Sequence, residues 1–168
     1  MRAALDAFRR IVQALRVADR DGQRRTSLTS AQLFALQQIV EHPGASVNDV
    51  AALTFTHQSS VSVVIQRLVA RRLVGKVAAS QDRRRQRLAP TAEGRRALRR
   101  APVAVQGRLI AAISALAPAD RRALARALAE VASLVTPKTA APHPPMLFEN
   151  GVAGGGRSKT GRHPRDGK

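Results

Sequence analysis

The hydrophobic pattern of this chain departs from the helical period in one segment, residues 73–89, and this departure limits the folds available to the chain. Before residue 73, apolar side chains recur every three or four residues, as they do in helices. Leu73–Ala79 and Gln86–Ala89 instead read as two short strands, and a charged tip over residues 81–85 lies between them. The sequence therefore predicts a mainly α protein with a small two-stranded β wing.

Helix-start signals divide the segment before this hairpin. Thr29 and Ser46 are followed three residues later by Gln32 and Asp49, which is the spacing of a capping box. We therefore expect the second and third helices to begin at these two positions. The other predicted boundaries are a first helix over about residues 3–21 that ends at Gly22, a stop at His42-Pro43-Gly44, a turn at Thr54-Phe55-Thr56, and a fourth helix over about residues 57–72 with Thr56 as its N-cap.

Two further helices are predicted after the hairpin. Thr91 is placed to cap the first of them, which should run to Leu116 with a kink at Pro102. The second should cover Pro118–Val135, because proline suits the first helical position. Helices before and after a two-stranded wing are the layout of a winged helix-turn-helix protein.

Residues 136–168 have a different composition from the rest of the chain. Pro142-His143-Pro144-Pro145 and Gly154-Gly155-Gly156 supply no apolar surface for a core, so this tail is predicted to be disordered. Met146-Leu147-Phe148 is a small apolar island within it, which we interpret as inert rather than as a docking motif. The chain thus divides into one domain over residues 1–135 and a basic tail over residues 136–168.

The net charge indicates a polyanionic partner. Lys and Arg number 29 against 11 acidic residues, which gives +18, and about +14 of this falls on residues 1–135. Such a field attracts nucleic acid first and anionic membrane second. No apolar run is long enough to cross a bilayer. The alternative interpretation is a soluble chain that is merely rich in Arg.

The fourth predicted helix carries the candidate base-reading residues. Its apolar stripe of Val61, Ile65 and Leu68 should face the core, and the opposite face is polar. In a helix-turn-helix this exposed face enters the major groove, where glutamine can bond adenine. The alternative is an ordinary solvated helix face. The predicted recognition residues are His57, Gln58, Ser59, Ser62, Val63 and Gln66.

The tip of the hairpin is strongly basic. Arg83, Arg84, Arg85 and Arg87 lie within five residues, where they can bind phosphate or enter a narrow minor groove. Asp82 is out of place in such a patch, and we expect it to hold one of the arginines in a fixed geometry.

The stretch Asp82-Arg83-Arg84 … Thr91-Ala92-Glu93-Gly94 resembles the wing signature of the MarR family, D-x-R … L-T-x-x-G. The segment from Leu53 to Leu73-Val74 is similar to that family's turn, recognition helix and exit into the wing, and the likeness spans residues 5–135. The resemblance implies an obligate homodimer held by helices at about 3–21 and 91–135, and a DNA-binding lobe at about 29–91. It also implies minor-groove insertion of Arg84 and, in many members, release from DNA when a small phenolic or lipophilic molecule binds between the two parts.

The sequence departs from the family pattern at four positions. Pro90 replaces a leucine and would shorten the second strand, and Thr54 replaces a glycine, so the turn must avoid positive φ there. Val63 stands where an arginine is frequent, and Arg85 replaces a serine. Because of these departures, the family resemblance does not predict the base sequence of the operator.

Other functions have less support. The four histidines have no metal-ligand spacing and no catalytic motif occurs, so we expect neither an enzyme nor a cofactor. The absence of Cys excludes disulfides and thiol sensing. Binding to single-stranded nucleic acid needs exposed aromatic rings, and Phe8, Phe34 and Phe55 are predicted to be core. The sequence favours a cytoplasmic homodimeric repressor of transcription that binds double-stranded DNA without a membrane, with a nonspecific architectural DNA-binding protein as the alternative.

Overall fold

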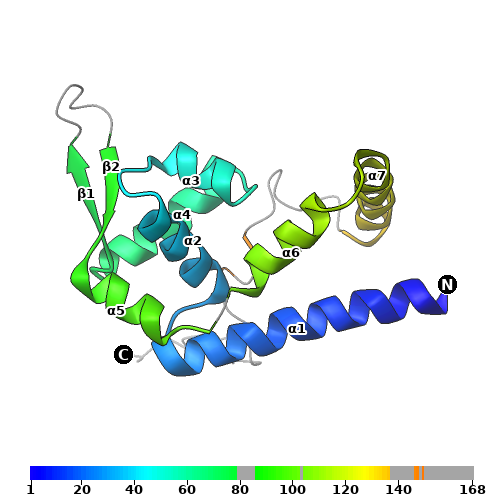
Figure 1. The fold of residues 1–168 in the computed structure, drawn as a ribbon, viewed down its shortest axis with the longest axis horizontal. Helices are drawn as coiled ribbons and strands as arrows, with labels where there is room; N and C mark the ends of the chain where they lie inside the picture. Colours follow the sequence, from blue (N-terminus) through cyan, green and yellow to red (C-terminus); the bar gives the residue numbers. More distant parts are fainter. Residues whose placement is uncertain (79–85, 103, 137–145, 148, 150–168) are drawn as a thin grey trace, which may run out of the picture.

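The computed structural model describes residues 1–78, 86–102, 104–136, 146, 147 and 149 (Figure 1). Within these residues the chain forms seven helices and one antiparallel pair of strands, which confirms the predicted mainly α fold with a small β wing. None of the described helices is long and apolar enough to cross a bilayer. In chain order the elements are α1 (Arg2–Thr26), α2 (Ser30–Glu41), α3 (Val47–Leu53), α4 (Gln58–Ala70), β1 (Val74–Ala78), β2 (Gln86–Pro90), α5 (Ala92–Arg100), α6 (Val105–Ser114) and α7 (Pro118–Val135).

Helix α2 lies at the centre of the fold. It contacts α1, α3, α4, α5, α6 and β2, and the apolar residues Leu33, Phe34, Leu36 and Ile39 along it are all buried. The core is completed by the inner faces of α4 and the wing. A periodic sequence pattern does not reveal that partners will cover this helix on several sides.

The predicted caps of α2 and α3 are confirmed. The Gln32 N–H donates to the Thr29 hydroxyl at 3.2 Å, and the Gln32 side chain accepts from the Thr29 N–H at 3.1 Å. Ser46 and Asp49 make the same reciprocal pair. These capping boxes fix where both helices begin.

The predicted end of the first helix at Gly22 is wrong, because α1 continues to Thr26. Gly22 is buried where α1 crosses α2, and a Cβ there would lie 2.7 Å from the Leu33 Cδ1 atom. Its role is therefore close packing within a continuous helix. Arg25 bonds Asp21 across the last turn at 3.0 Å, which lowers the pKa of the Asp21 carboxyl below its usual value.

The long helix predicted after the wing is divided in two. Helix α5 ends at Arg100, and Ala101 and Ala104 have extended backbone before α6 begins at Val105. The residue before a proline avoids helical geometry, and Pro102 itself has no N–H to donate. Pro102 therefore ends the helix, whereas we predicted only a kink.

The wing is a five-residue antiparallel pair. Its register places Val74 opposite Pro90 and Ala78 opposite Gln86, so β2 extends to Pro90. The predicted shortening of this strand by Pro90 is wrong, because proline is tolerated at the end of an edge strand.

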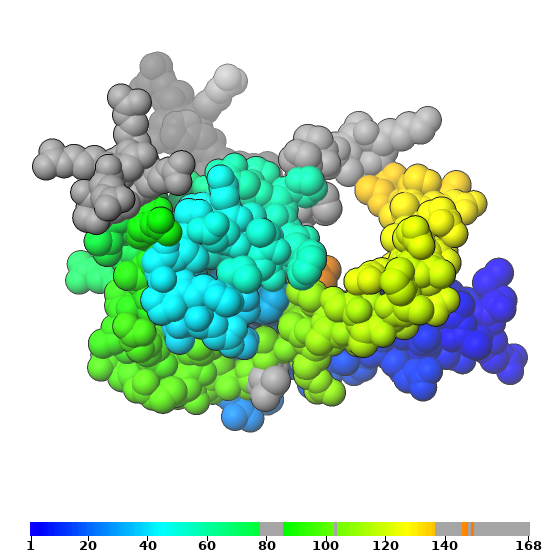
Figure 2. Space-filling model, turned by 45° about the horizontal axis from the view of Figure 1, so that its top comes forward, coloured from blue at the N-terminus to red at the C-terminus, as the bar shows by residue number. Residues whose placement is uncertain are grey.

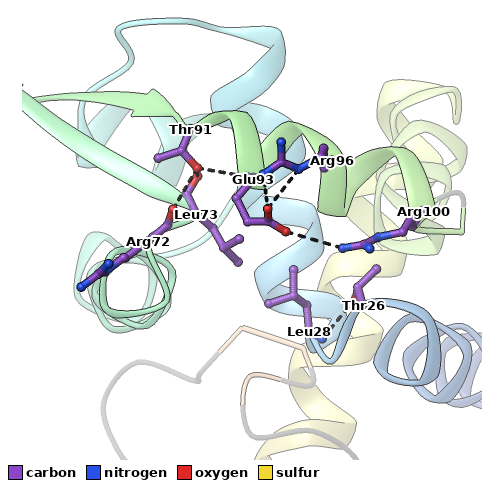
Figure 3. Close-up of polar contacts among 9 residues, drawn as sticks. Thr26, Leu28, Arg72, Leu73, Thr91, Glu93, Arg96 and Arg100 are labelled. Atoms are coloured by element: carbon purple, nitrogen blue, oxygen red, sulfur yellow. Dashed lines mark hydrogen bonds and ion pairs between the residues drawn. The ribbon is translucent and has the colours of Figure 1, made fainter.

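The junction between wing and α5 is built around the carbonyl group of Leu73 (Figure 3). Its oxygen accepts from the Thr91 N–H at 3.0 Å, and the Thr91 hydroxyl in turn accepts from the Gly94 N–H at 3.0 Å. This confirms Thr91 as the cap of the helix after the wing. Arg96 donates to Glu93 within the same turn and lowers the pKa of the Glu93 carboxyl below its usual value.

Two of the three phenylalanines predicted to be core are exposed. Phe34 is buried, but Phe8 is 58% exposed on α1 and Phe55 is 76% exposed in the turn before α4. Phe55 has a φ of 51°, which directs the chain into α4 and leaves its ring on the surface.

We expect Gly94→Ala to lower the free energy of unfolding by at least about 2 kcal/mol, because the added methyl would overlap the Leu73 carbonyl oxygen and force the backbone apart. Gly107→Ala in α6 is the matched control. The nearest atom to its new methyl is Phe34 Cε2 at 3.5 Å, and helix propensity alone should stabilise this variant by up to about 1 kcal/mol. Urea unfolding followed by circular dichroism measures both. Equal stability of the two variants would contradict the close approach of Gly94 to the Leu73 carbonyl group.

Candidate nucleic-acid interface

The turn between α3 and α4 sets the direction of the candidate recognition helix. The Thr54 hydroxyl donates to the Val50 carbonyl at 2.8 Å, and the Thr56 N–H donates to the Ala51 carbonyl at 3.0 Å. Thr54 has a φ of −94°, as expected for a threonine in this place, and Phe55 takes the left-handed position instead. The turn therefore needs no glycine.

Helix α4 has one buried and one exposed face. Val61, Val64, Ile65 and Leu68 are buried against the core. Of the six residues predicted to read bases from this helix, five are exposed and Ser62 is half-buried. The structure brings all six together at the start and along one side of α4; they are His57, Gln58, Ser59, Ser62, Val63 and Gln66.

The first turn of α4 is electropositive. His57 is its N-cap, which corrects the prediction of Thr56, whose hydroxyl donates to the Thr54 carbonyl. The His57 side chain makes no capping hydrogen bond, and no acidic residue lies in the first turn. In α2 and α3, by contrast, Thr29 and Ser46 cap the first turn with their side chains. The start of α4 thus keeps the partial positive charge of the helix dipole, which suits a phosphate group.

The wing is fixed to the loop between α2 and α3. The Leu88 N–H donates to the Ala45 carbonyl at 2.9 Å, and the Gly44 N–H donates to the Leu88 carbonyl at 3.1 Å. Arg87 adds a bond from its Nη1 atom to the Gly44 carbonyl at 2.9 Å while its side chain stays exposed. The hairpin is therefore held at a set position relative to α4.

The tip of the wing lies outside the described residues. Asp82, Arg83, Arg84 and Arg85 all belong to residues 79–85, so their predicted roles remain predictions. Arg87 is the one predicted wing residue whose contacts are described.

A cavity of about 410 Å³ lies between the turn before α4 and helix α6. Figure 2 shows the hollow between the lobe, in cyan, and the arm formed by α6 and α7, in yellow. Its lining is mostly apolar, with a few polar groups; the lining residues are Phe34, Thr54, Phe55, Thr56, His57, Gln106, Leu109, Ile110, Met146 and Leu147. In the part of the chain that the structure describes, no group of acidic residues or histidines could hold a metal ion.

Sequence reasoning missed the contribution of the tail to this cavity. Met146 is 4% exposed and belongs to the main apolar cluster, so the prediction that residues 146–148 form an inert island is wrong at this position. The other predicted disorder concerns residues that are not described, except Thr136, Leu147 and Glu149. The sequence signal that could have indicated this docking was the apolar Met146 close to the acidic Glu149 in an otherwise polar tail.

Comparisons with known proteins also indicate a winged helix-turn-helix protein. A model of the MarR family matches residues 26–85, which cover α2, α3, α4 and β1. No curated protein sequence matches significantly.

Solved structures extend the similarity to most of the chain. Bordetella bronchiseptica BpsR, whose DNA binding is regulated by 6-hydroxynicotinic acid, is 26% identical over 76% of this chain and 91% of its own, with a TM-score of 0.51. S. aureus MepR in complex with DNA is 20% identical over 76% of this chain and 93% of its own, with a TM-score of 0.52. A MarR family transcription regulator, SP03579, has a TM-score of 0.55 at 17% identity over 79% of this chain and 87% of its own.

The family model and the fold together confirm the resemblance inferred from the wing signature. Residues 26–85 of the chain match the MarR family of transcription regulators, and the chain has the same winged helix-turn-helix fold as a solved member of that family.

Proposed function

We propose that this chain binds double-stranded DNA as a homodimer, reads a pseudo-palindromic operator and represses transcription. The observation that carries the proposal is the exposed face of α4, which joins an electropositive first turn to a row of polar side chains. Its opposite face is locked into the core, so the exposed face is held in a fixed orientation. In the cytoplasm, the protein bound to its operator would then keep the transcription machinery off that DNA.

Each part of the interface has a distinct role in this proposal. Gln58 and Gln66 bond base edges in the major groove, and Val63 offers an apolar contact to a thymine methyl group. The backbone amides at the start of α4 bind phosphate. Arg84 enters the minor groove and its arginine neighbours bind phosphates, which position the protein without reading sequence.

Exposed apolar side chains on α1 and α7 support a homodimer. Helix α7 has no buried residue, and its exposed Leu128, Val131 and Leu134 would lie in water if the chain stayed single. Leu5 and Phe8 are exposed in the same way on α1, and Figure 1 shows that the N-terminal half of α1 and α7 extend to the same side of the lobe. Helices with such faces are stable when a partner covers them.

The cavity beside α4 supports an effector of small size. It is large enough for a ring-sized molecule and combines apolar walls with a few polar groups, as ligand sites do. A molecule that binds there contacts the turn that orients α4, so it acts on DNA binding without touching DNA. The regulation of BpsR by 6-hydroxynicotinic acid is the parallel for this part of the proposal.

Selection from randomised duplex DNA at about 150 mM salt, with excess competitor, tests the main proposal. We expect an inverted repeat whose half-sites lie about one helical turn, ~34 Å, apart. Gln66→Ala should relax the preference at one position of each half-site, whereas Gln13→Ala, an exposed glutamine on α1, should leave the profile unchanged. Tight but flat enrichment would instead support a nonspecific architectural protein.

We expect Arg84→Ala to weaken binding more on an operator with an A·T-rich minor groove than on one with G·C pairs at the same positions, because the narrow groove concentrates negative potential. The slope of log Kd against log salt should fall by about 1. Arg121→Ala on α7 removes the same charge and is the control. Equal losses for Arg84→Ala on both operators would exclude minor-groove insertion.

We expect Val131→Asp to raise the dissociation constant of the dimer at least about tenfold, because an unpaired carboxylate is costly to bury. Val77→Asp is the matched control: Val77 is 55% exposed and Val131 is 57% exposed, but Val77 lies on the wing. Sedimentation velocity measures both. A dimer of unchanged affinity in Val131→Asp would place the interface elsewhere.

A further inference from the structure

Three described residues of the C-terminal tail, Met146, Leu147 and Glu149, dock on the body of the protein, and we call them the clasp. Glu149 donates its backbone N–H to the Met146 carbonyl at 3.0 Å, so the clasp is a single turn of chain. The side chains of Met146 and Glu149 are buried. In Figure 2 this part of the tail, in orange, lies at the inner edge of the hollow between lobe and arm.

The clasp is bound from two different helices. Gln106 of α6 donates from Nε2 to the Leu147 carbonyl at 2.7 Å. Arg67 of α4 donates from Nη1 to the Glu149 carbonyl at 2.9 Å and lies 3.6 Å from its carboxylate Oε1 atom. The clasp thus connects the candidate recognition helix to the arm that carries α6 and α7.

The clasp forms part of the wall of the cavity that a small molecule would use. Met146 and Leu147 line the cavity together with Phe34, Leu109 and Ile110, so a molecule larger than this cavity would have to move them. The fit is incomplete, because the Gln106 Oε1 atom is buried and accepts no hydrogen bond from any described residue. A buried acceptor without a donor is costly, and an incoming molecule with an N–H or O–H group would satisfy it.

We propose that the clasp is an intramolecular ligand of this cavity, and that an apolar small molecule and the clasp exclude one another. Its attachment suits a displaceable occupant: one buried apolar side chain, two hydrogen bonds to side chains and one long ion pair hold it. Displacement would remove a link between α4 and α6. The effector site named above would then be regulated by the chain's own tail, and to that extent this inference rests on the proposed function.

Competition with an uncharged apolar dye tests the clasp in the full-length chain. Nile red avoids attraction to the +18 charge, and its binding is followed by fluorescence titration. An internal ligand raises the apparent Kd of any competitor, so we expect Met146→Ser to bind Nile red about tenfold more tightly than the unmodified protein. Met146→Leu conserves the apolar volume and should behave like the unmodified protein.

A synthetic peptide that spans residues 144–151 separates competition from loosened structure. Added to Met146→Ser, it should displace the dye and restore the original apparent affinity, which a partly unfolded protein would not allow. Glu149→Gln should also strengthen dye binding, whereas Asp166→Asn makes the same change of charge elsewhere in the tail and should not.

Unchanged dye affinity in Met146→Ser, or an increase that the peptide fails to reverse, would overturn the proposal. Because no DNA is present in these titrations, their failure leaves the operator selection unaffected. A failed operator selection likewise leaves the competition result unaffected.

Discussion

A helix that is buried on several sides must satisfy its first amide groups inside the protein, and α2 meets this condition with side chains from two elements. The Thr29 hydroxyl accepts from the Gln32 N–H, and the buried Asp19 of α1 accepts from the Ser30 N–H at 2.7 Å. Unpaired amides there would oppose burial of the whole helix. Because α2 contacts α4 and β2, this polar arrangement also determines where the candidate recognition helix and the wing lie.

The parts of the fold and site that could be predicted depend on neighbours in the sequence. Caps at Thr29, Ser46 and Thr91 use side chains that bond amides three residues later, so the sequence alone specifies them. The exposed face of α4 followed from helical spacing, because the apolar stripe around Ile65 fixes which side is left outside. In the same way, the change of period over residues 73–89 predicted the hairpin.

The parts that could not be predicted depend on contacts between distant segments. Gly22 has the form of a helix stop, but its position against Leu33 gives it a packing role within a continuous helix. Phe8 fits an apolar stripe, but the described chain contains nothing that covers it. Met146 lies in a segment of low apolar content, and its burial comes from contact with the distant apolar core cluster, beside the bond from Gln106 to Leu147. The local sequence pattern does not show which distant segments will contact a residue.

The division between α5 and α6 has a mechanical consequence. A continuous helix would have transmitted rotation of the arm directly to the wing, since Thr91 anchors α5 to the carbonyl of Leu73. Extended backbone at Ala101 and Ala104 interrupts that rod. The direction of α6 is thus set by its packing against α1 and α2, and not by one continuous helix from the wing. In the homodimer proposed above, this packing would set the separation of the two lobes while each lobe keeps its own internal geometry.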